Sequence, residues 1–518
     1  MTSHSRRSVM LGAAAASATL PLNDAQAQAS PSKPNLILFF PDEMRADVVG
    51  SYGNPICQTP NFDRLAKEGA RFENCHVQYP VCGASRCSLL TGWPTSVRGH
   101  RSLYYFLRPD EPNMFRYLRQ AGYDVVWLGK NDALAPGSFA DSVTQWSDAP
   151  MGLPPGVKSL APPGVTTMLY SSGGDRRATS DYALLQKAFA ILERKEADRP
   201  VCIFLAMSEP HPPYTAPDSF GAMYKPADLP PLIPPGLAKK PNFHAAIRRK
   251  FGLERASDAD LRQVRATYYG QVSYTDWLLG EMLEALDRTG RTKDTALFVA
   301  SDHGDYAGDY GLIEKWPSGM ESCLTHVPLI GRTPGGTPGV VARDMVELYD
   351  IMATFLELGG ARAAHTHFAR SLLPQMQGRA GDPNRAAFTE GGYNDYEPQA
   401  FEPKLGGLYA PKTELQNDEP ETIRRCASIK TSRYTYVARP GGQGELYDRK
   451  ADPGETRNLI DERGSQATVD QMQQRLLNWY INTSGVPDTA KDARGLPPYY
   501  ATEPKKATPE ELARILDQ

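Results

Sequence analysis

Four short apolar runs, each followed at once by polar or charged residues, are the strongest pattern in the chain. They occupy residues 35–40, 124–128, 201–207 and 296–300. Each run is continuously apolar rather than alternating, which is typical of strands covered on both faces in a parallel sheet. Ligands bind beyond the carboxyl ends of such strands, so the polar residues that follow predict a site at one edge of the sheet.

Helical periodicity between these runs supplies the crossover connections of a parallel sheet. Residues 62–68, 113–121 and 182–194 each predict a helix, and the clearest pattern runs over 261–288. There the apolar residues recur at three- and four-residue spacing, which packs one face of a helix on a sheet. The proline-rich segment 210–241 predicts an ordered loop around the cleft. The fold class is therefore α/β, with a large mixed, mostly parallel sheet sandwiched by helices.

The C-terminal part of the chain predicts a smaller α+β subdomain. Regular signals weaken from residue 360 to about residue 421. Beyond that point the pattern predicts strands at residues 426–429 and 434–437. A short segment at 445–448 and a helix at 468–481 follow. We expect a main domain over residues 33–400, and over residues 420–518 a subdomain with a small antiparallel sheet and a helix.

The N-terminal residues predict a targeting segment. Arg6 and Arg7 stand directly before the mostly apolar run 9–22, and small residues follow over 25–29. This run is shorter than the ~20 residues that span a bilayer. We therefore expect residues 1–29 to be a twin-arginine signal peptide, with an uncleaved membrane anchor as the alternative. No other stretch predicts a membrane span, so the mature protein is expected to be periplasmic or secreted.

Composition narrows the classes of function. The chain has 518 residues, of which 41% are hydrophobic, enough for a large core. A net charge of -3 gives no indication of a basic nucleic-acid-binding face. The seven cysteines do not form the paired C-x-x-C pattern of a zinc site. Export permits disulfides, and the odd number leaves at least one thiol, for which Cys82 is the candidate.

Cys82 stands among small residues, in the stretch Cys82-Gly83-Ala84-Ser85-Arg86. This stretch predicts a tight bend that leads into a helix, with Arg86 one turn after Cys82. An arginine at that spacing can hold an anion beside the sulfur atom. A cysteine beside small residues is more often a buried core residue, which is the alternative interpretation.

Acidic residues and histidine follow the first and last apolar runs. Asp42 and Glu43 follow the first run, and Asp302 and His303 follow the fourth. Oxygen ligands of this kind suit Ca²⁺ or Mg²⁺, and a single histidine does not require a transition metal. The alternative is that each acidic pair caps the helix that follows it.

Short polar and glycine-containing segments recur over nearly the whole mature chain. They include Thr59-Pro60-Asn61-Phe62-Asp63-Arg64-Leu65-Ala66, Cys82-Gly83-Ala84-Ser85-Arg86, Gly129-Lys130, Pro210-His211-Pro212-Pro213-Tyr214, Ser301-Asp302-His303-Gly304 and Gly311-Leu312-Ile313-Glu314-Lys315. In their sequence and their order, these segments resemble the sulfatase family of the alkaline-phosphatase-like superfamily.

The resemblance implies a sulfuric ester hydrolase with a modified nucleophile. Cys82 would be oxidised to Cα-formylglycine by a maturation enzyme, and the hydrated aldehyde would attack sulfur. Arg86, Lys130 and Lys315 would neutralise the sulfate, and His211 would protonate the leaving oxygen. A divalent cation is implied, Ca²⁺ first and Mg²⁺ or Mn²⁺ as alternatives. Its implied ligands are Asp42, Glu43, Cys82, Asp302 and His303.

Three positions depart from the family's common pattern. Glu43 replaces a more usual Asp or Gln, and Ala84 replaces a frequent Pro. Asp132 stands where the family often has a histidine that assists breakdown of the hemiacetal. We expect Asp132 to take over that role, with His100 as a possible substitute.

Two other functions compete with a sulfatase that acts on a sulfated small molecule or saccharide. One is a phosphonate monoester or phosphodiester hydrolase of the same superfamily, and the other is an unmodified, metal-stabilised glycan-binding protein. Loop aromatic residues are candidates for substrate recognition, namely Tyr104, Tyr105, Trp316, Tyr393 and Tyr396.

Overall fold

The computed structural model describes residues 33–148, 152–194, 199–394, 396–397, 400–404, 406–442 and 444–486. The expected signal peptide, residues 1–29, and the end of the expected C-terminal subdomain lie outside these residues. Within the described ranges, no helix has the length and apolar character needed to cross a membrane. The described residues fall within one compact unit.

The four predicted strands are all present and lie side by side at the centre of a large sheet. They are β1 (Asn35–Phe40), β3 (Asp124–Gly129), β5 (Val201–Ala206) and β6 (Thr295–Ala300). They pair in parallel in the order β3-β5-β1-β6, so their carboxyl ends share one edge. The prediction of a parallel sheet from continuous apolar runs is confirmed.

Further strands make this a mixed sheet of nine strands in the described part of the chain. β4 (Gln145–Ser147) extends the sheet beyond β3. Beyond β6 lie β8 (Leu329–Arg332), β2 (Ala70–His76), β7 (His326–Val327) and β9 (Val340–Glu347). β8 runs antiparallel to β6 and β2, whereas β9 is parallel to β2. The predicted mixed, mostly parallel sheet is therefore confirmed.

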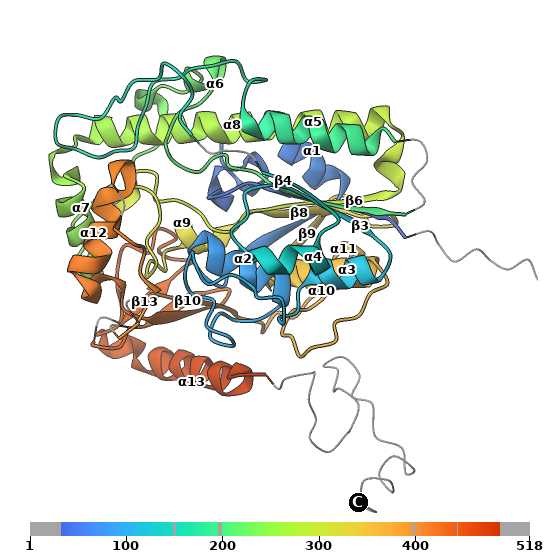
Figure 1. Ribbon diagram of the computed structural model, residues 1–518. Coiled ribbons are helices and arrows are strands. Elements are labelled where there is room, and N and C mark those ends of the chain that lie inside the picture. The colour runs from blue at the N-terminus through green and yellow to red at the C-terminus, as the bar shows by residue number, and fades with distance from the viewer. Residues whose placement is uncertain are drawn as a thin grey trace, which may run out of the picture. The chain divides into compact units, whose positions relative to one another are not determined.

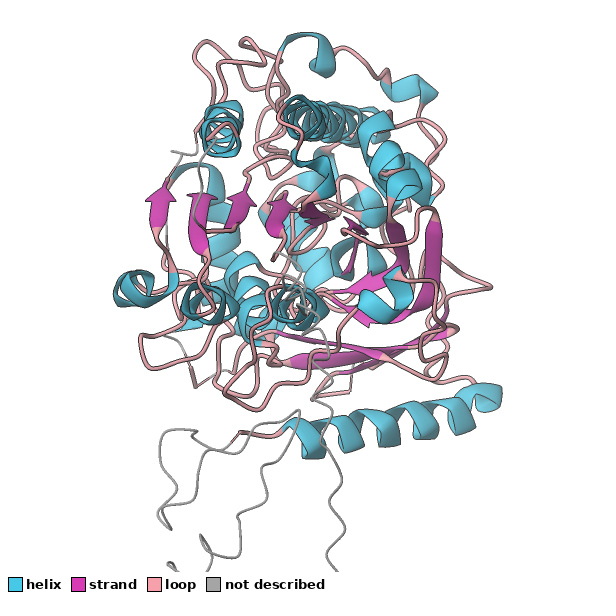
Figure 2. Ribbon diagram, turned by 90° about the vertical axis from the view of Figure 1, so that its right-hand side faces the viewer, coloured by secondary structure: helices cyan, strands magenta, loops and turns pink. Residues whose placement is uncertain are grey.

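Helices cover both faces of this sheet (Figure 1, Figure 2). On one face lie α1 (Pro60–Glu68), α5 (Ser180–Leu192) and α8 (Asp258–Arg288). On the other lie α2 (Cys82–Thr91), α3 (Met114–Gln120), α4 (Phe139–Ser142) and α10 (Asp350–Leu358). Alternate side chains of β1 enter the two cores, since Phe39 packs on the α8 side and Phe40 on the α2 side.

The longest predicted helix, α8, is confirmed and has a clear start signal. The Ser257 side chain accepts a hydrogen bond from the Asp260 amide, and the Asp260 carboxylate accepts one from the Ser257 amide. This capping box satisfies two backbone donors at the start of the helix. Most of the 210–241 segment is irregular, and it contains the short helices α6 (Asp218–Gly221) and η4 (Pro226–Asp228).

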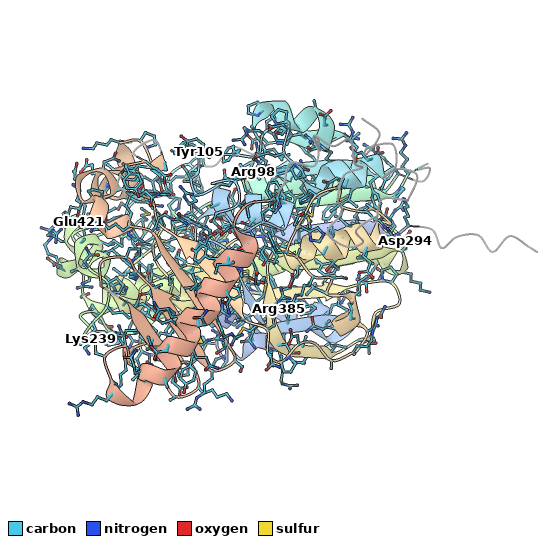
Figure 3. All side chains as sticks on the ribbon, turned by 90° about the horizontal axis from the view of Figure 1, so that it is seen from below. Arg98, Tyr105, Lys239, Asp294, Arg385 and Glu421 are labelled. Atoms are coloured by element: carbon cyan, nitrogen blue, oxygen red, sulfur yellow. The ribbon has the colours of Figure 1, made fainter. Side chains whose placement is uncertain are left out.

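A second, antiparallel sheet has the order β10-β11-β12-β13. Its strands are β10 (Ala387–Gly391), β11 (Cys426–Lys430), β12 (Tyr434–Ala438) and β13 (Glu445–Asp448). Helix α13 (Gln466–Thr483) lies across one face, packing Val469, Met472 and Leu476 on the sheet (Figure 3). β11, β12 and α13 match their predicted positions, and the segment 445–448, for which no element was predicted, forms β13. β10 was not predicted, and it lies inside the range expected for the main domain.

β10 ties the small sheet to the large one. The Glu390 amide donates to the carbonyl oxygen of Gln78 at 2.9 Å, and the Thr389 hydroxyl donates to that of Val77 at 2.6 Å. Nearby, Arg385 forms ion pairs with Glu347 and Asp350 (Figure 3). The remaining α-helices among the described residues are α7 (Phe243–Lys250), α9 (Ser322–Thr325), α11 (Leu373–Met376) and α12 (Ala410–Asp418).

Candidate active site

The shared edge of the four central strands carries most of the predicted site residues. Asp42 and Glu43 follow β1, Lys130 follows β3, His211 follows β5, and Asp302 and His303 follow β6. Contacts between their side chains, described below, bring them together with Cys82, Arg86 and Lys315. Residues up to 272 positions apart in the chain thus meet in one buried cluster.

Cys82 is the first residue of α2, after Val81 in an extended conformation. Its Sγ lies 3.1 Å from His303 Nε2, 3.5 Å from Asp42 Oδ1 and 3.6 Å from Lys130 Nζ. Ser85 Oγ donates to the carbonyl oxygen of Asp302 at 2.7 Å, which fixes the first turn of α2 against the end of β6. The predicted turn into a helix is confirmed.

Arg86 lies one helical turn after Cys82 and joins two carboxylates. Its Nε donates to Asp302 Oδ2 at 2.8 Å and its Nη2 to Asp42 Oδ2 at 3.0 Å. The side chain is completely buried. Its third nitrogen, Nη1, has no hydrogen-bond partner among the described residues. One buried donor thus remains for an anion at this place.

Lys130 reaches the site because Gly129 allows a close approach between strands. A Cβ at Gly129 would lie 2.1 Å from the carbonyl oxygen of Ala206, and its φ of 109° favours glycine. Lys130 Nζ contacts Asp42 Oδ2 at 2.7 Å and Asp132 Oδ2 at 2.9 Å. Burial alone would lower the pKa of Lys130, but Asp132 and Asp42 raise it well above its usual value. The lysine therefore stays charged.

Four residues at this edge offer a set of metal ligands. One ligand atom each from Asp42, Cys82, Asp302 and His303 lies within 4.8 Å of the others. His303 Nδ1 donates to the carbonyl oxygen of Gly304 at 2.9 Å, so Nε2 faces the cluster with a free lone pair. Burial lowers the pKa of His303 to about 4, which keeps this nitrogen unprotonated. The donor set fits a divalent cation that prefers oxygen ligands.

Glu43 lies outside this four-residue group, but ligand atoms of Asp42, Glu43 and His211 form a second group within 4.8 Å of one another. The Glu43 φ of 67° is unusual for a residue other than glycine. The Glu43 amide donates to Asp302 Oδ1 at 3.1 Å, and its carbonyl oxygen accepts from the Tyr268 hydroxyl at 2.8 Å. Glu43 Oε2 lies 2.7 Å from Lys315 Nζ, whereas Oε1 is buried without a partner in the described part of the chain. The role of Glu43 as a metal ligand stays a prediction.

His211 and Lys315 form a buried pair. His211 Nδ1 donates to the carbonyl oxygen of Pro212 at 2.5 Å, so Nε2 accepts a hydrogen bond from Lys315 Nζ at 2.9 Å. Burial, followed by the charge of Lys315, lowers the pKa of His211 well below its usual value. An anion bound beside Lys315 would offset that positive charge and favour protonation of His211.

The other candidates differ in where the structure places them. Asp132 contacts Lys130, and its expected role in breakdown of the hemiacetal stays a prediction. His100 uses both ring nitrogens in buried structural contacts, with the Tyr105 carbonyl oxygen and with Glu111. All seven cysteines lie in the described part of the chain, and they are buried and free.

The expectation for two aromatic residues was wrong. Trp316 and Tyr393 are each only 1% exposed, because both pack into the core around the site. Tyr104, Tyr105 and Tyr396 are exposed by 50%, 42% and 83% and remain available to a substrate. Burial, followed by the charge of Glu402, raises the pKa of Tyr104.

The sequence analysis did not identify Lys412, which lies behind the site residues and contacts Glu314. Lys412, on α12, donates from Nζ to Glu314 Oε1 at 2.8 Å, and Lys315 Nζ donates to the same oxygen at 3.1 Å. α12 comes from the region where regular patterns weaken, so no local signal marked Lys412 as part of the site.

The chain is similar to known proteins over most of its length. The family model described as Sulfatase matches residues 34–361. The chain is 28% identical to an arylsulfatase of Clostridium perfringens over 490 residues, covering 86% of this chain and 94% of the relative. It is 27% identical to the multifunctional alkaline phosphatase superfamily protein PehA of Trinickia caryophylli over 519 residues, covering 87% and 96%.

Solved structures share the fold. The phosphonate monoester hydrolase of Agrobacterium radiobacter superposes with a TM-score of 0.69 at 22% identity, covering 87% of this chain and 96% of that one. A structure described as a complex with its substrate D-glucosamine-2-N,6-O-disulfate has a TM-score of 0.67 at 19% identity, covering 87% and 98%. The family model covers well over half of the chain, which therefore belongs to the sulfatase family.

Proposed function

We propose that this protein hydrolyses a sulfate ester to an alcohol and inorganic sulfate. The observation that carries the proposal is the position of Cys82 at the start of α2, in contact with His303, Asp42 and Lys130. Burial, and then the charge of Asp42, raise the pKa of the Cys82 thiol well above its usual value. A thiol in this state is a poor nucleophile, so a modified side chain explains the site better.

Formylglycine made from Cys82 by a maturation enzyme would supply a hydrated aldehyde as the nucleophile, from which sulfate is later released. A divalent cation, Ca²⁺ or alternatively Mg²⁺ or Mn²⁺, would be held by Asp42, Asp302, His303 and residue 82, and would polarise sulfate oxygens. The chain's own cations, described next, bind the rest of the anion.

The charges around Cys82 support a substrate with one negative charge. Asp42, Asp132 and Asp302 face the permanent cations of Arg86 and Lys130 in the described part of the site. This arrangement leaves one excess negative charge, which a divalent cation would convert into one excess positive charge. A sulfate monoester is a monoanion, and so is a phosphodiester, whereas a phosphate monoester carries up to two charges.

Five side chains would act during the reaction. Arg86, Lys130 and Lys315 would hold the sulfate oxygens and stabilise the charge that develops on them. His211, once protonated, would donate its Nε2 proton to the leaving oxygen. Asp132 would accept a proton as sulfate is released. Because these groups are largely buried, water competes little for their hydrogen bonds.

We further propose that the alcohol part is a sulfated small molecule or saccharide that rests against exposed aromatic residues such as Tyr104. The relative with a bound disulfated glucosamine supports a saccharide.

We also propose export by the twin-arginine pathway to the periplasm or medium, which rests on residues 1–29 of the sequence. The division into domains 33–400 and 420–518 stays a prediction. β10 lies within the first range but pairs with β11 of the small sheet.

A second candidate is hydrolysis of a phosphonate monoester or phosphodiester, which the similarity to the Agrobacterium enzyme favours. A matched pair of substrates separates the two functions. We expect 4-nitrophenyl sulfate to be hydrolysed with a kcat/KM at least about tenfold above bis(4-nitrophenyl) phosphate, a difference of about 1.4 kcal/mol. Since both release 4-nitrophenol, the ratio reports the preferred anion. A higher kcat/KM for the diester would overturn the proposal in favour of the second candidate.

A further inference from the structure

Lys315 lies between two carboxylates in a buried row of alternating charges. Its Nζ is 2.7 Å from Glu43 Oε2 and 3.1 Å from Glu314 Oε1. Lys412 Nζ then lies 2.8 Å from the same Glu314 oxygen. No side chain in this row is more than 2% exposed. The row therefore links the site residue Lys315 to α12, outside the large sheet.

Glu314 is held firmly between the two lysines. Its backbone has a φ of 58°, and its amide donates to the Tyr214 hydroxyl at 2.9 Å. If Lys412 were missing, Glu314 would be a buried carboxylate with Lys315 as its remaining near cation. It would then draw Lys315 away from Glu43 and His211, and its charge would oppose a bound anion.

The segment that carries Lys412 also supports His211. The Tyr409 hydroxyl, just before α12, donates to the carbonyl oxygen of Pro212 at 3.2 Å. That same oxygen accepts the hydrogen bond from His211 Nδ1. The segment with Tyr409 and Lys412 thus contacts two groups that hold proposed active-site residues. These are Glu314, which holds Lys315, and the Pro212 carbonyl oxygen, which holds His211.

We infer that Lys412 is a positioning residue of the active site: through Glu314 it sets the place and charge balance of Lys315. The inference rests on the proposed function, in which Lys315 stabilises charge that develops in the transition state. Such a contribution appears in kcat, because an interaction that grows in the transition state does not strengthen ground-state binding equally. A lysine that bound the substrate equally well in the ground state and in the transition state would instead change KM.

The test compares Lys412→Met with Lys412→Arg in steady-state kinetics on 4-nitrophenyl sulfate. We expect Lys412→Met to lower kcat about tenfold to a hundredfold, the usual effect of losing a group that orients a catalytic residue. KM is expected to stay within about threefold. Lys412→Arg keeps the charge and is expected to retain kcat within about threefold. Glu314→Gln should lower kcat as well, and adding Lys412→Met to it should cost little more, because the two residues act as one unit.

A matched control lies on the same segment. Lys404 pairs with Asp418 of α12 at 2.7 Å, but its side chain is 57% exposed. Lys404→Met removes such a surface pair and should leave kcat and KM unchanged. Thermal unfolding curves show which variants fold. If Lys412→Met does not fold, Glu314→Gln serves as the test.

Two results would overturn the inference: a folded Lys412→Met or Glu314→Gln variant with unchanged kcat, or one in which only KM rises. Each variant is also assayed on bis(4-nitrophenyl) phosphate. If the wild type prefers the diester, the proposed function fails, and a fall in kcat on the diester still supports the role of Lys412.

Discussion

Replacement of Cys82 by alanine is expected to abolish turnover of every ester that the protein hydrolyses. The side chain at this position would supply the nucleophile, and removal of a covalent nucleophile costs on the order of 10⁶ in kcat. Alanine suits the first turn of α2 and removes one buried atom, so the fold should persist. Initial rates on 4-nitrophenyl sulfate and a thermal unfolding curve measure the two effects separately.

Cys87 provides the matched control for this substitution. It is also buried in α2, and its Sγ faces the carbonyl oxygen of Ala133 at 3.6 Å instead of the site. Cys87→Ala also removes one buried sulfur atom from α2, but it should retain activity. Substantial turnover by folded Cys82→Ala protein would disprove the proposed mechanism.

Replacement of His211 by alanine is expected to have an effect that depends on the leaving group. A general acid contributes about 10² to 10⁴ in rate when the leaving oxygen needs a proton. We therefore expect kcat/KM to fall by about that factor for an alkyl sulfate, and much less for 4-nitrophenyl sulfate. The reason is that 4-nitrophenolate departs readily without protonation. Parallel assays of both esters with wild type and variant give the ratio of the two losses.

His100→Gln is the control for His211→Ala, and it also tests whether His100 takes part in catalysis. Because His100 already bonds to Glu111 and to the Tyr105 carbonyl oxygen, its replacement should affect both esters equally. Equal losses for the two esters in His211→Ala would show that His211 supports the site without donating the proton.

The central part of the fold could be predicted because burial on both faces leaves a continuous apolar run. β1, β3, β5 and β6 all have this pattern, which predicted a parallel sheet with a shared carboxyl edge but not the order of the strands. β2 could not be predicted in this way, because its burial is broken and partly exposed residues interrupt the run. β10 and α12 lie in a region of weak periodicity, where tertiary contacts rather than local sequence decide the structure.

The site residues at strand ends could be predicted because polar, ligand-forming side chains directly follow buried strands, where parallel sheets bind ligands. Asp302 and His303, for example, are polar residues directly after a buried strand. Lys412 could not be predicted, since its importance depends on a contact with Glu314 that joins positions 98 residues apart. Trp316 was misplaced for a related reason. Sequence does not tell whether a loop aromatic faces solvent or, as here, packs against the body and donates to the Thr422 carbonyl oxygen.

Mass spectrometry of one peptide tests most directly whether Cys82 acts as formylglycine rather than as a thiol. Trypsin releases residues 72–86, which contain both Cys75 and Cys82. After alkylation of active protein made together with a maturation enzyme, Cys75 marks an ordinary thiol within the same peptide. We expect one alkylated cysteine, at position 75, and the mass of an aldehyde at position 82. Alkylation of both residues in fully active protein would contradict this expectation.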